Sequence, residues 1–246
     1  MSGTIGPMRL FYSPFHSFAH KALVVAHEKG LWDRITLVPT FPFRNLNREF
    51  VTGQYDMSAI APLGKVPCLA LDDGTVLYGS QTVVEYLDSI GHGLKLYPED
   101  GAARWDALTR LALGDAIFEL AVQMSMENWI DKAARRSSLY EWLWPKVIGA
   151  LDEAERWAAG GPAFDIGAIG LLQGISYLGE KVSDEDPVHP GYDWRSGRPA
   201  LSSWYANVIE RPSVQSHLGK DYDGDMSPEN HQAHVTAVLA ARETAR

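Results

Sequence analysis

Apolar residues follow two different patterns along the chain, and the change between them falls near residue 92. Before this point, short apolar runs predict strands over 8–12, 35–38, 68–71 and 75–78. Apolar positions at helical spacing predict helices over 17–29 and 81–90. The order β-α-β-loop-β-β-α predicts a mixed four-stranded sheet with helices on its faces, because a βαβ unit of this length requires a parallel pair of strands.

Residues 93–246 show helical spacing through most of their length. Helices are predicted there over 102–129, 139–159, the stretch after residue 165, and 200–209. Pro145 is expected to kink or break the second of these helices, and Asp165 is expected to cap the third. The last stretch, 221–246, is polar at first and then weakly helical. We therefore expect an α/β domain over 1–92 and an all-α domain over 93–246.

Composition and charge argue against several classes of function. Of the 246 residues, 46% are apolar and 22% are charged, as in an ordinary globular protein. No apolar run is long enough to cross a bilayer and the first residues do not resemble a signal peptide, so we expect a cytoplasmic protein. The net charge of −9 is concentrated in 93–246, which holds 15 Lys/Arg against 23 Asp/Glu. This acidity argues against nucleic acid and anionic membranes as partners.

Cys68 is the single cysteine, which excludes an intrachain disulfide, a Cys-x-x-Cys redox pair and a thiolate-rich metal site. It lies at the start of a predicted strand, so we expect a buried and unreactive thiol. His16 and His20 are four residues apart but have no third partner at ligand spacing, and we predict no metal.

The most informative segment is Pro62-Leu63-Gly64-Lys65-Val66-Pro67, a loop that leads into an apolar strand. A tight Asp73-Gly74 turn and a second strand follow, and Ser80 stands where a helix begins. We expect Ser80 to be the N-cap of that helix. This order brings a proline, exposed backbone groups and the positive end of a helix together, which suits an extended peptide with a carboxylate.

These motifs resemble those of the cytosolic glutathione transferases of bacterial type, without assigning a class. The resemblance extends from Met8 to Gln215 and includes Ser80-Gln81-Thr82-Val83-Val84-Glu85-Tyr86-Leu87-Asp88 and, near its end, Arg211-Pro212-Ser213. It implies a thioredoxin-like glutathione-binding domain over 1–92 and an all-helical domain over 93–246 that contributes the electrophile pocket. It also implies a homodimer with glutathione as co-substrate and a role in detoxification.

The resemblance assigns the binding of glutathione to His16, Lys65, Val66, Pro67, Ser80 and Gln81. It implies a cis bond before Pro67, so that the Val66 backbone pairs with the cysteinyl part of glutathione like an added strand. An ordinary trans proline at the start of an edge strand is the alternative. Gly79 stands where the family usually has Glu or Asp, which removes an acceptor for the ammonium group of the ligand.

The group that activates the thiol is open between two registers. Many relatives carry Ser-Pro-Phe with a basic residue five positions after the serine. Identity selects Ser13, whereas counting back from Lys21 selects His16 and its neighbour Ser17. We assign Ser13 and Ser17 jointly as catalytic candidates; the alternative is that Ser17 caps the first helix and Ser13 shapes the turn.

The resemblance places Phe15, Phe118 and Met124 at the pocket for a small apolar electrophile, and core packing is the alternative for Phe118 and Met124. The predicted function is that of an enzyme that activates the glutathione thiol as a thiolate for attack on this electrophile. The alternative is a non-catalytic protein of the same fold that binds glutathione, another ligand or a protein.

Overall fold

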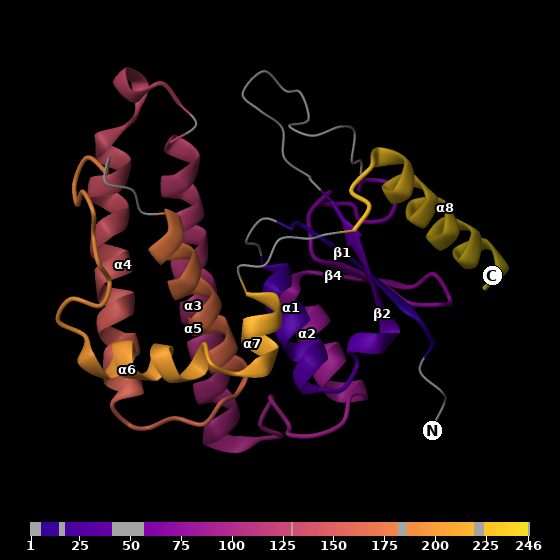
Figure 1. Cartoon of the computed structure of the whole chain (residues 1–246), viewed down its shortest axis with the longest axis horizontal. Coiled ribbons are helices and arrows are strands. Elements are labelled where there is room, and N and C mark those ends of the chain that lie inside the picture. Colours follow the sequence, from indigo (N-terminus) through magenta and orange to yellow (C-terminus); the bar gives the residue numbers. More distant parts are fainter. Residues whose placement is uncertain are drawn as a thin grey trace. The chain divides into compact units, whose positions relative to one another are not determined.

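The computed structural model describes residues 6–14, 18–40, 57–128, 130–181, 186–218 and 224–245 (Figure 1). The chain divides into two compact units. The first combines Met1–Leu94 with Ser216–Arg246, and the second is Lys95–Gln215. The expected boundary at residue 92 lies close to this division. The expected second domain, 93–246, differs from it at the C-terminal end, because the last residues pack with the first unit.

The first unit contains the four-stranded mixed sheet that the sequence predicts, in the order β2-β1-β3-β4. Its strands are β1 (Met8–Tyr12), β2 (Ile35–Pro39), β3 (Cys68–Ala70) and β4 (Val76–Tyr78). β1 and β2 are parallel, with Met8 opposite Ile35, and β3 is antiparallel to both β1 and β4. The helix over Ala19–Glu28 lies between β1 and β2 and provides the crossover that a parallel pair requires, and β3 and β4 follow as an antiparallel hairpin.

Helices lie on both faces of this sheet (Figure 1). α1 (Ala19–Glu28) and α2 (Ser80–Ile90) pack together on one face, and η1 (Trp32–Arg34) follows α1. A buried ion pair joins the two helices, with Lys29 Nζ 3.1 Å from Asp88 Oδ1. α8 (Pro228–Thr244) covers the other face, where Val235 and Val238 are buried in one cluster with Phe11 and Val38.

The second unit is helical. It contains α3 (Gly101–Glu127), η2 (Lys132–Ala134), α4 (Ser137–Ala158), α5 (Ile166–Lys181), α6 (Pro199–Val208) and the first residues of α7 (Pro212–His217). α4 continues through Pro145, so the predicted break does not occur. Buried side chains on both sides of the proline, Trp144 and Val147, hold this part of the helix in the core.

α3 and α5 approach each other at glycines. A Cβ atom built at Gly114 would lie 2.2 Å from the carbonyl carbon of Gly170, and one built at Gly174 would lie 2.3 Å from the carbonyl oxygen of Gly114. Real Cβ contacts are never this short, so side chains larger than hydrogen would push the helices apart. Glycine at these positions therefore sets the distance between the two helices of this core.

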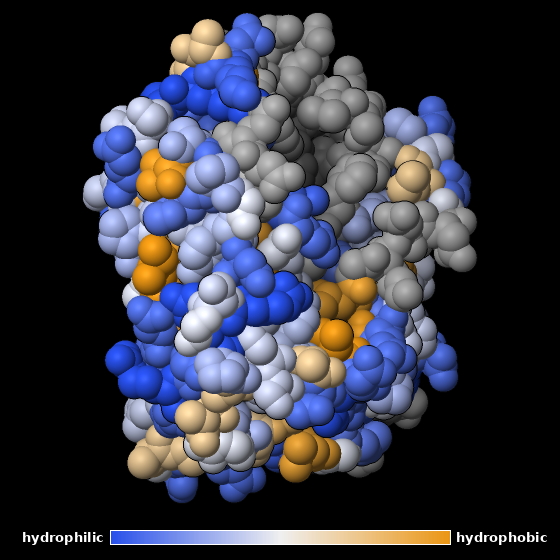
Figure 2. Space-filling view, turned by 60° about the vertical axis from the view of Figure 1, so that its left-hand side comes forward, coloured by the Kyte–Doolittle hydropathy of each residue, from blue (hydrophilic) through white to orange (hydrophobic). Residues whose placement is uncertain are grey.

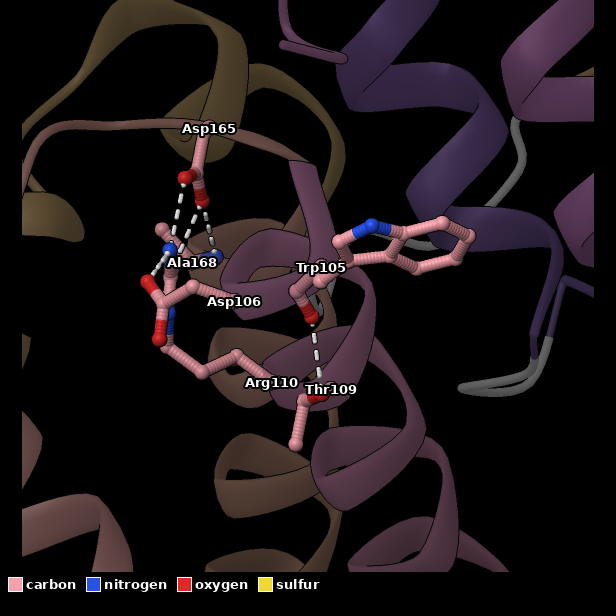
Figure 3. A network of polar contacts seen from close by, with 6 residues as sticks. All are labelled: Trp105, Asp106, Thr109, Arg110, Asp165 and Ala168. Carbon is pink, nitrogen blue, oxygen red and sulfur yellow. Dashed lines mark hydrogen bonds and ion pairs between the residues drawn. The ribbon is translucent and has the colours of Figure 1, made fainter. Parts of the chain in front are cut away.

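A polar network fixes the start of α5 (Figure 3). Asp165 Oδ1 accepts a hydrogen bond of 3.0 Å from the backbone N–H of Ala168, which confirms Asp165 as the cap of this helix. The same carboxylate binds the guanidinium of Arg110 through two bonds of 2.8 and 2.9 Å. Arg110 also donates to Asp106 one turn earlier on α3. The network thereby ties the start of α5 to α3.

The face of the molecule shown in Figure 2 is predominantly hydrophilic, and its hydrophobic residues form small separate groups. Within the described ranges, none of the helices combines the length and the apolar character that spanning a membrane requires.

Candidate functional site

The predicted glutathione corner begins with a hydrogen-bonded turn that precedes the Lys65-Val66-Pro67 loop. The N–H groups of Ile60 and Ala61 donate to the Met57 carbonyl at 3.1 and 2.8 Å, and Gly64 N–H donates to the Ala61 carbonyl at 2.9 Å. Gly64 has a φ of 57°, in the left-handed region that glycine tolerates. These bonds set the direction in which the chain enters the loop.

The Val66–Pro67 peptide bond is cis, as the sequence analysis expects. Lys65 is exposed, Val66 is half-buried and Pro67 is buried. β3 begins at Cys68, so Val66 lies outside the ladder between β1 and β3. The Val66 N–H and C=O groups form no hydrogen bond to the part of the chain that the structure describes. This short backbone segment can therefore accept an extended peptide as an additional strand.

The helix at this corner, α2, starts one residue earlier than predicted. Ser80 is its first residue and Gly79 is its N-cap, so the assignment of Ser80 as the N-cap is wrong. Gly79 has a φ of 87°, a backbone conformation that side chains other than hydrogen rarely adopt. The turn into α2 therefore gives a physical reason for glycine at a position where the resembling family has an acidic residue.

The N-terminal end of α2 is suited to an anion. Its N-cap residue, Gly79, has no side chain that could cap the helix, and the first turn contains no acidic residue. The N–H groups of a first helical turn have no acceptor within the helix, and the helix dipole adds positive potential there. Ser80, which is half-buried, and Gln81, which is exposed, are the first two residues of this turn. The end of α2 can bind a carboxylate.

The activation candidates are described only in part. Ser13 follows β1 directly and its side chain is fully buried. Phe15, His16 and Ser17 lie outside the described residues. The choice between the Ser13 register and the Ser17 register therefore stays a prediction.

Cys68 is buried, as predicted. Its thiol donates to the Lys65 carbonyl oxygen, with Sγ and O 3.0 Å apart, and burial raises its pKa to about 12. A thiol with this pKa is protonated at neutral pH and is a poor nucleophile. Cys68 thus supports the loop before Pro67 rather than supplying chemistry. No group of three or more metal-ligating side chains occurs among the described residues.

Phe118 and Met124 on α3 are both 4% exposed. The Phe118 ring lies 4.4 Å from the ring of Tyr177 on α5, between centroids, and the Met124 carbonyl accepts a bond of 3.1 Å from Tyr140. Tyr177 also shares a hydrogen bond of 3.0 Å with Ser125, and burial raises its pKa. These contacts agree with the alternative given for Phe118 and Met124, which is packing in the helical core.

The N-terminal part of the chain, residues 15–90, matches the family model described as the glutathione S-transferase N-terminal domain. A glutathione transferase family member from Pseudomonas fluorescens Pf-5, solved with bound glutathione, is 31% identical to the chain, and the match covers 85% of this chain and 98% of that one with a TM-score of 0.72. The chain belongs to the glutathione transferase family. Its sheet and helical unit thus form the thioredoxin-like and all-helical parts that the resemblance implied.

Two further proteins that are similar to this chain support the same family assignment. A glutathione S-transferase from Methylobacillus flagellatus, solved with glutathione bound, is 26% identical over 85% of this chain and 98% of that chain, with a TM-score of 0.72. Glutathione S-transferase L1 from Arabidopsis thaliana is 26% identical over 200 residues, which is 81% of this chain and 76% of that protein. The relatives come from bacteria and a plant, and the class within the family stays unassigned.

Proposed function

We propose that this protein is an enzyme, a glutathione transferase that binds glutathione at the corner between Val66 and the start of α2. The observation that carries the proposal is the pairing of a Val66 backbone that bonds to none of the described residues with a helix end whose N-cap is glycine and whose first turn contains no acidic residue. The first suits the cysteinyl backbone of glutathione and the second suits its γ-glutamyl carboxylate. Related proteins solved with glutathione bound support the choice of ligand.

In the proposed binding mode, Lys65, Val66 and Pro67 contact the cysteinyl and glycyl parts of glutathione, and Ser80 and Gln81 contact the γ-glutamyl carboxylate. His16 is the further binding residue of the proposal. Gly79 carries no carboxylate for the ligand ammonium group, so we expect weaker glutathione binding than an acidic residue at this position would give.

The proposed reaction begins with loss of the proton from the glutathione thiol to solvent. A hydroxyl that donates a hydrogen bond to the sulfur stabilises the thiolate and lowers the pKa of the thiol. The thiolate then forms a carbon–sulfur bond to an electrophile, and the leaving group departs with its electron pair. Ser13 and Ser17 are the proposed donors, and the burial of Ser13 makes Ser17 the residue whose removal we expect to cost more activity.

The electrophile in this proposal is a small apolar molecule. Phe15, Phe118 and Met124 are its proposed contacts, because aromatic and thioether side chains adapt to apolar ligands of different shapes. We further propose that the protein acts as a cytoplasmic homodimer in detoxification. Light scattering on the purified protein tests the oligomeric state.

The test combines binding and turnover. We expect the protein to be retained on immobilised glutathione, eluted by free glutathione, and active with a generic aryl halide. Ser13→Ala and Ser17→Ala are compared with Ser89→Ala, which removes an exposed hydroxyl from the other end of α2. We expect a fall of roughly 10²-fold or more in kcat for the variant that removes the donor to sulfur. Equal rates in all three variants would overturn the activating assignment.

The alternative function, a non-catalytic binding protein, is supported by one observation, the absence of a carboxylate at Gly79. Retention on glutathione without turnover of any aryl halide would favour this alternative. Failure of both retention and turnover would overturn the glutathione assignment itself.

A further inference from the structure

The C-terminal helix α8 packs on the sheet face beneath the candidate binding loop. One side of α8 carries His231, Val235 and Val238, which are 1%, 1% and 0% exposed. Their spacing of four and three residues places them on one face of a helix. Val235 and Val238 belong to the same buried cluster as Phe11 and Cys68 of the neighbouring strands.

The start of α8 is anchored at the ends of β1 and β2. The His231 ring lies edge-on to Phe11, with centroids 5.8 Å apart, and its Nδ1 lies 3.4 Å from the Thr40 hydroxyl oxygen. Thr40 follows β2 and its N–H donates to the Tyr12 carbonyl at 2.8 Å. Ser227 caps the helix by accepting from Asn230 N–H at 3.1 Å. The helix therefore has a defined beginning beside the sheet.

Arg242, near the other end of α8, reaches two backbone carbonyls. Its Nε donates to the Gly74 carbonyl at 2.8 Å and its Nη2 donates to the Ile60 carbonyl at 3.1 Å. A Cβ atom built at Gly74 would lie 2.5 Å from the Arg242 nitrogen, so the helix backbone itself lies against this turn. One guanidinium thus joins the β3–β4 hairpin to the turn that precedes the Lys65-Val66-Pro67 loop.

Contacts continue from Arg242 and α8 to the loop. Ile60 directly precedes the turn in which the Ala61 carbonyl accepts from Gly64 N–H, and Lys65 follows Gly64. The Lys65 carbonyl accepts the Cys68 thiol, and Cys68 is in the cluster that contains Val235 and Val238. Val66 itself packs against this cluster. The loop therefore contacts groups that pack against α8 at three points: through the turn before Lys65, through the Val66 side chain, and through Cys68 after Pro67.

We propose that α8 is a C-terminal strap that positions the backbone of the Lys65-Val66-Pro67 loop for ligand binding, with Arg242 as its positioning residue. The proposal rests on the proposed function for the identity of the ligand, glutathione. Arg242 acts through the Ile60 and Gly74 carbonyls and needs no contact with the ligand. Loss of the guanidinium leaves the apolar face of α8 in place but releases the turn before Val66.

The test compares the full-length protein with Arg242→Ala and with Glu243→Ala, a change at the exposed neighbouring position on the same helix. Glutathione binding is measured by calorimetric titration, and KM and kcat are measured with an aryl halide. We expect Arg242→Ala to raise the Kd and KM for glutathione roughly fivefold or more, with little change in kcat at saturating glutathione. Glu243→Ala should leave all three unchanged.

Hydrogen exchange measured by mass spectrometry supplies a readout that needs no ligand. In Arg242→Ala we expect faster exchange in peptides covering 57–67, including Gly64 N–H, while peptides from α3 and α5 exchange as in the unaltered protein. If Arg242→Ala does not fold, Leu239→Ala trims the partly buried contact of the same helix with the cluster and is measured in the same way.

Unchanged exchange over 57–67 would overturn the strap, and so would a glutathione Kd within twofold of the unaltered value. If the unaltered protein binds no glutathione, the proposed function fails, and the exchange comparison alone then decides whether α8 positions the loop. A uniform rise in exchange throughout the molecule would also overturn the proposal, because it would show that Arg242 stabilises the fold as a whole.

Discussion

His27 Nδ1 and His217 Nε2 lie 3.2 Å apart, so the two imidazoles share one hydrogen bond. His217 is 6% exposed, and its ring lies 4.1 Å from the ring of Trp32, between centroids. Burial, and then the nearby His27, lower the pKa of His217 from 6.5 to about 4. The pair is stable only while at least one ring can accept, which makes this contact sensitive to acid.

The His217 contribution to the free energy of unfolding should be fully present above pH 6.5 and be lost as the pH falls towards 4. The sign follows from proton binding, because between these values the unfolded chain binds the proton that the folded chain excludes. The loss amounts to about 3 kcal/mol at most. We expect thermal unfolding measured from pH 8 to pH 4 to show a smaller fall in Tm for His217→Gln than for the unaltered protein.

His92→Gln is the matched control, since His92 is an exposed histidine in the same unit. It should follow the unaltered protein across the whole pH range. Parallel curves for His217→Gln and the unaltered protein would contradict the buried neutral imidazole.

The close approach of α3 and α5 predicts a large effect of a single methyl group. Gly114→Ala places a Cβ 2.2 Å from the Gly170 carbonyl carbon, so the helices must separate. We expect a loss of roughly 2–4 kcal/mol in the free energy of unfolding, measured by urea denaturation. Gly149→Ala on α4, where a Cβ would meet nothing within 4 Å, should be neutral or stabilising by up to about 1 kcal/mol. Similar values for the two variants would refute the packing argument.

Asp165 combines two roles that different substitutions separate. Asp165→Ala removes the cap of α5 and the partner of Arg110, and we expect a loss of roughly 2–4 kcal/mol in chemical denaturation. Asp165→Asn keeps an oxygen for the Ala168 N–H but removes the charge, so about 1 kcal/mol of this loss should be recovered. An Asn variant as unstable as the Ala variant would show that the cap contributes little.

The burial and raised pKa of Cys68 predict a thiol that reacts slowly with alkylating reagents. In the native protein at pH 7.5, we expect alkylation by iodoacetamide, followed by intact mass, to be at least about 10²-fold slower than in denaturant. Alkylation at equal rates in both conditions would mean that the Cys68 side chain reaches solvent.

The strands and helices of the first unit could be predicted because their sequence patterns are local. The second strand, predicted over 35–38, extends one residue further in the structure, to Pro39, which lies opposite Tyr12. β2 is at the edge of the sheet, where a missing N–H costs no ladder hydrogen bond. The position of the N-cap at Gly79 could not be read from the sequence, because it depends on the φ that the turn imposes.

The packing of α8 against the sheet could not be predicted for a different reason. Alanines and polar residues separate its three fully buried side chains, so its helical pattern is weak. Nothing local indicates that this face meets Phe11 and Cys68, which are more than 150 residues away in the sequence. The contacts of Arg242 could not be predicted either, because its partners are backbone carbonyls, which every residue has.

A crystal structure of the protein with glutathione is the decisive test of the proposed binding corner. We expect density for the tripeptide with its cysteinyl backbone against Val66 and its γ-glutamyl carboxylate at the first turn of α2, at Ser80 and Gln81. The sulfur would then identify its hydroxyl donor. A corner that stays empty at saturating glutathione, or a ligand bound elsewhere, would contradict the proposed site.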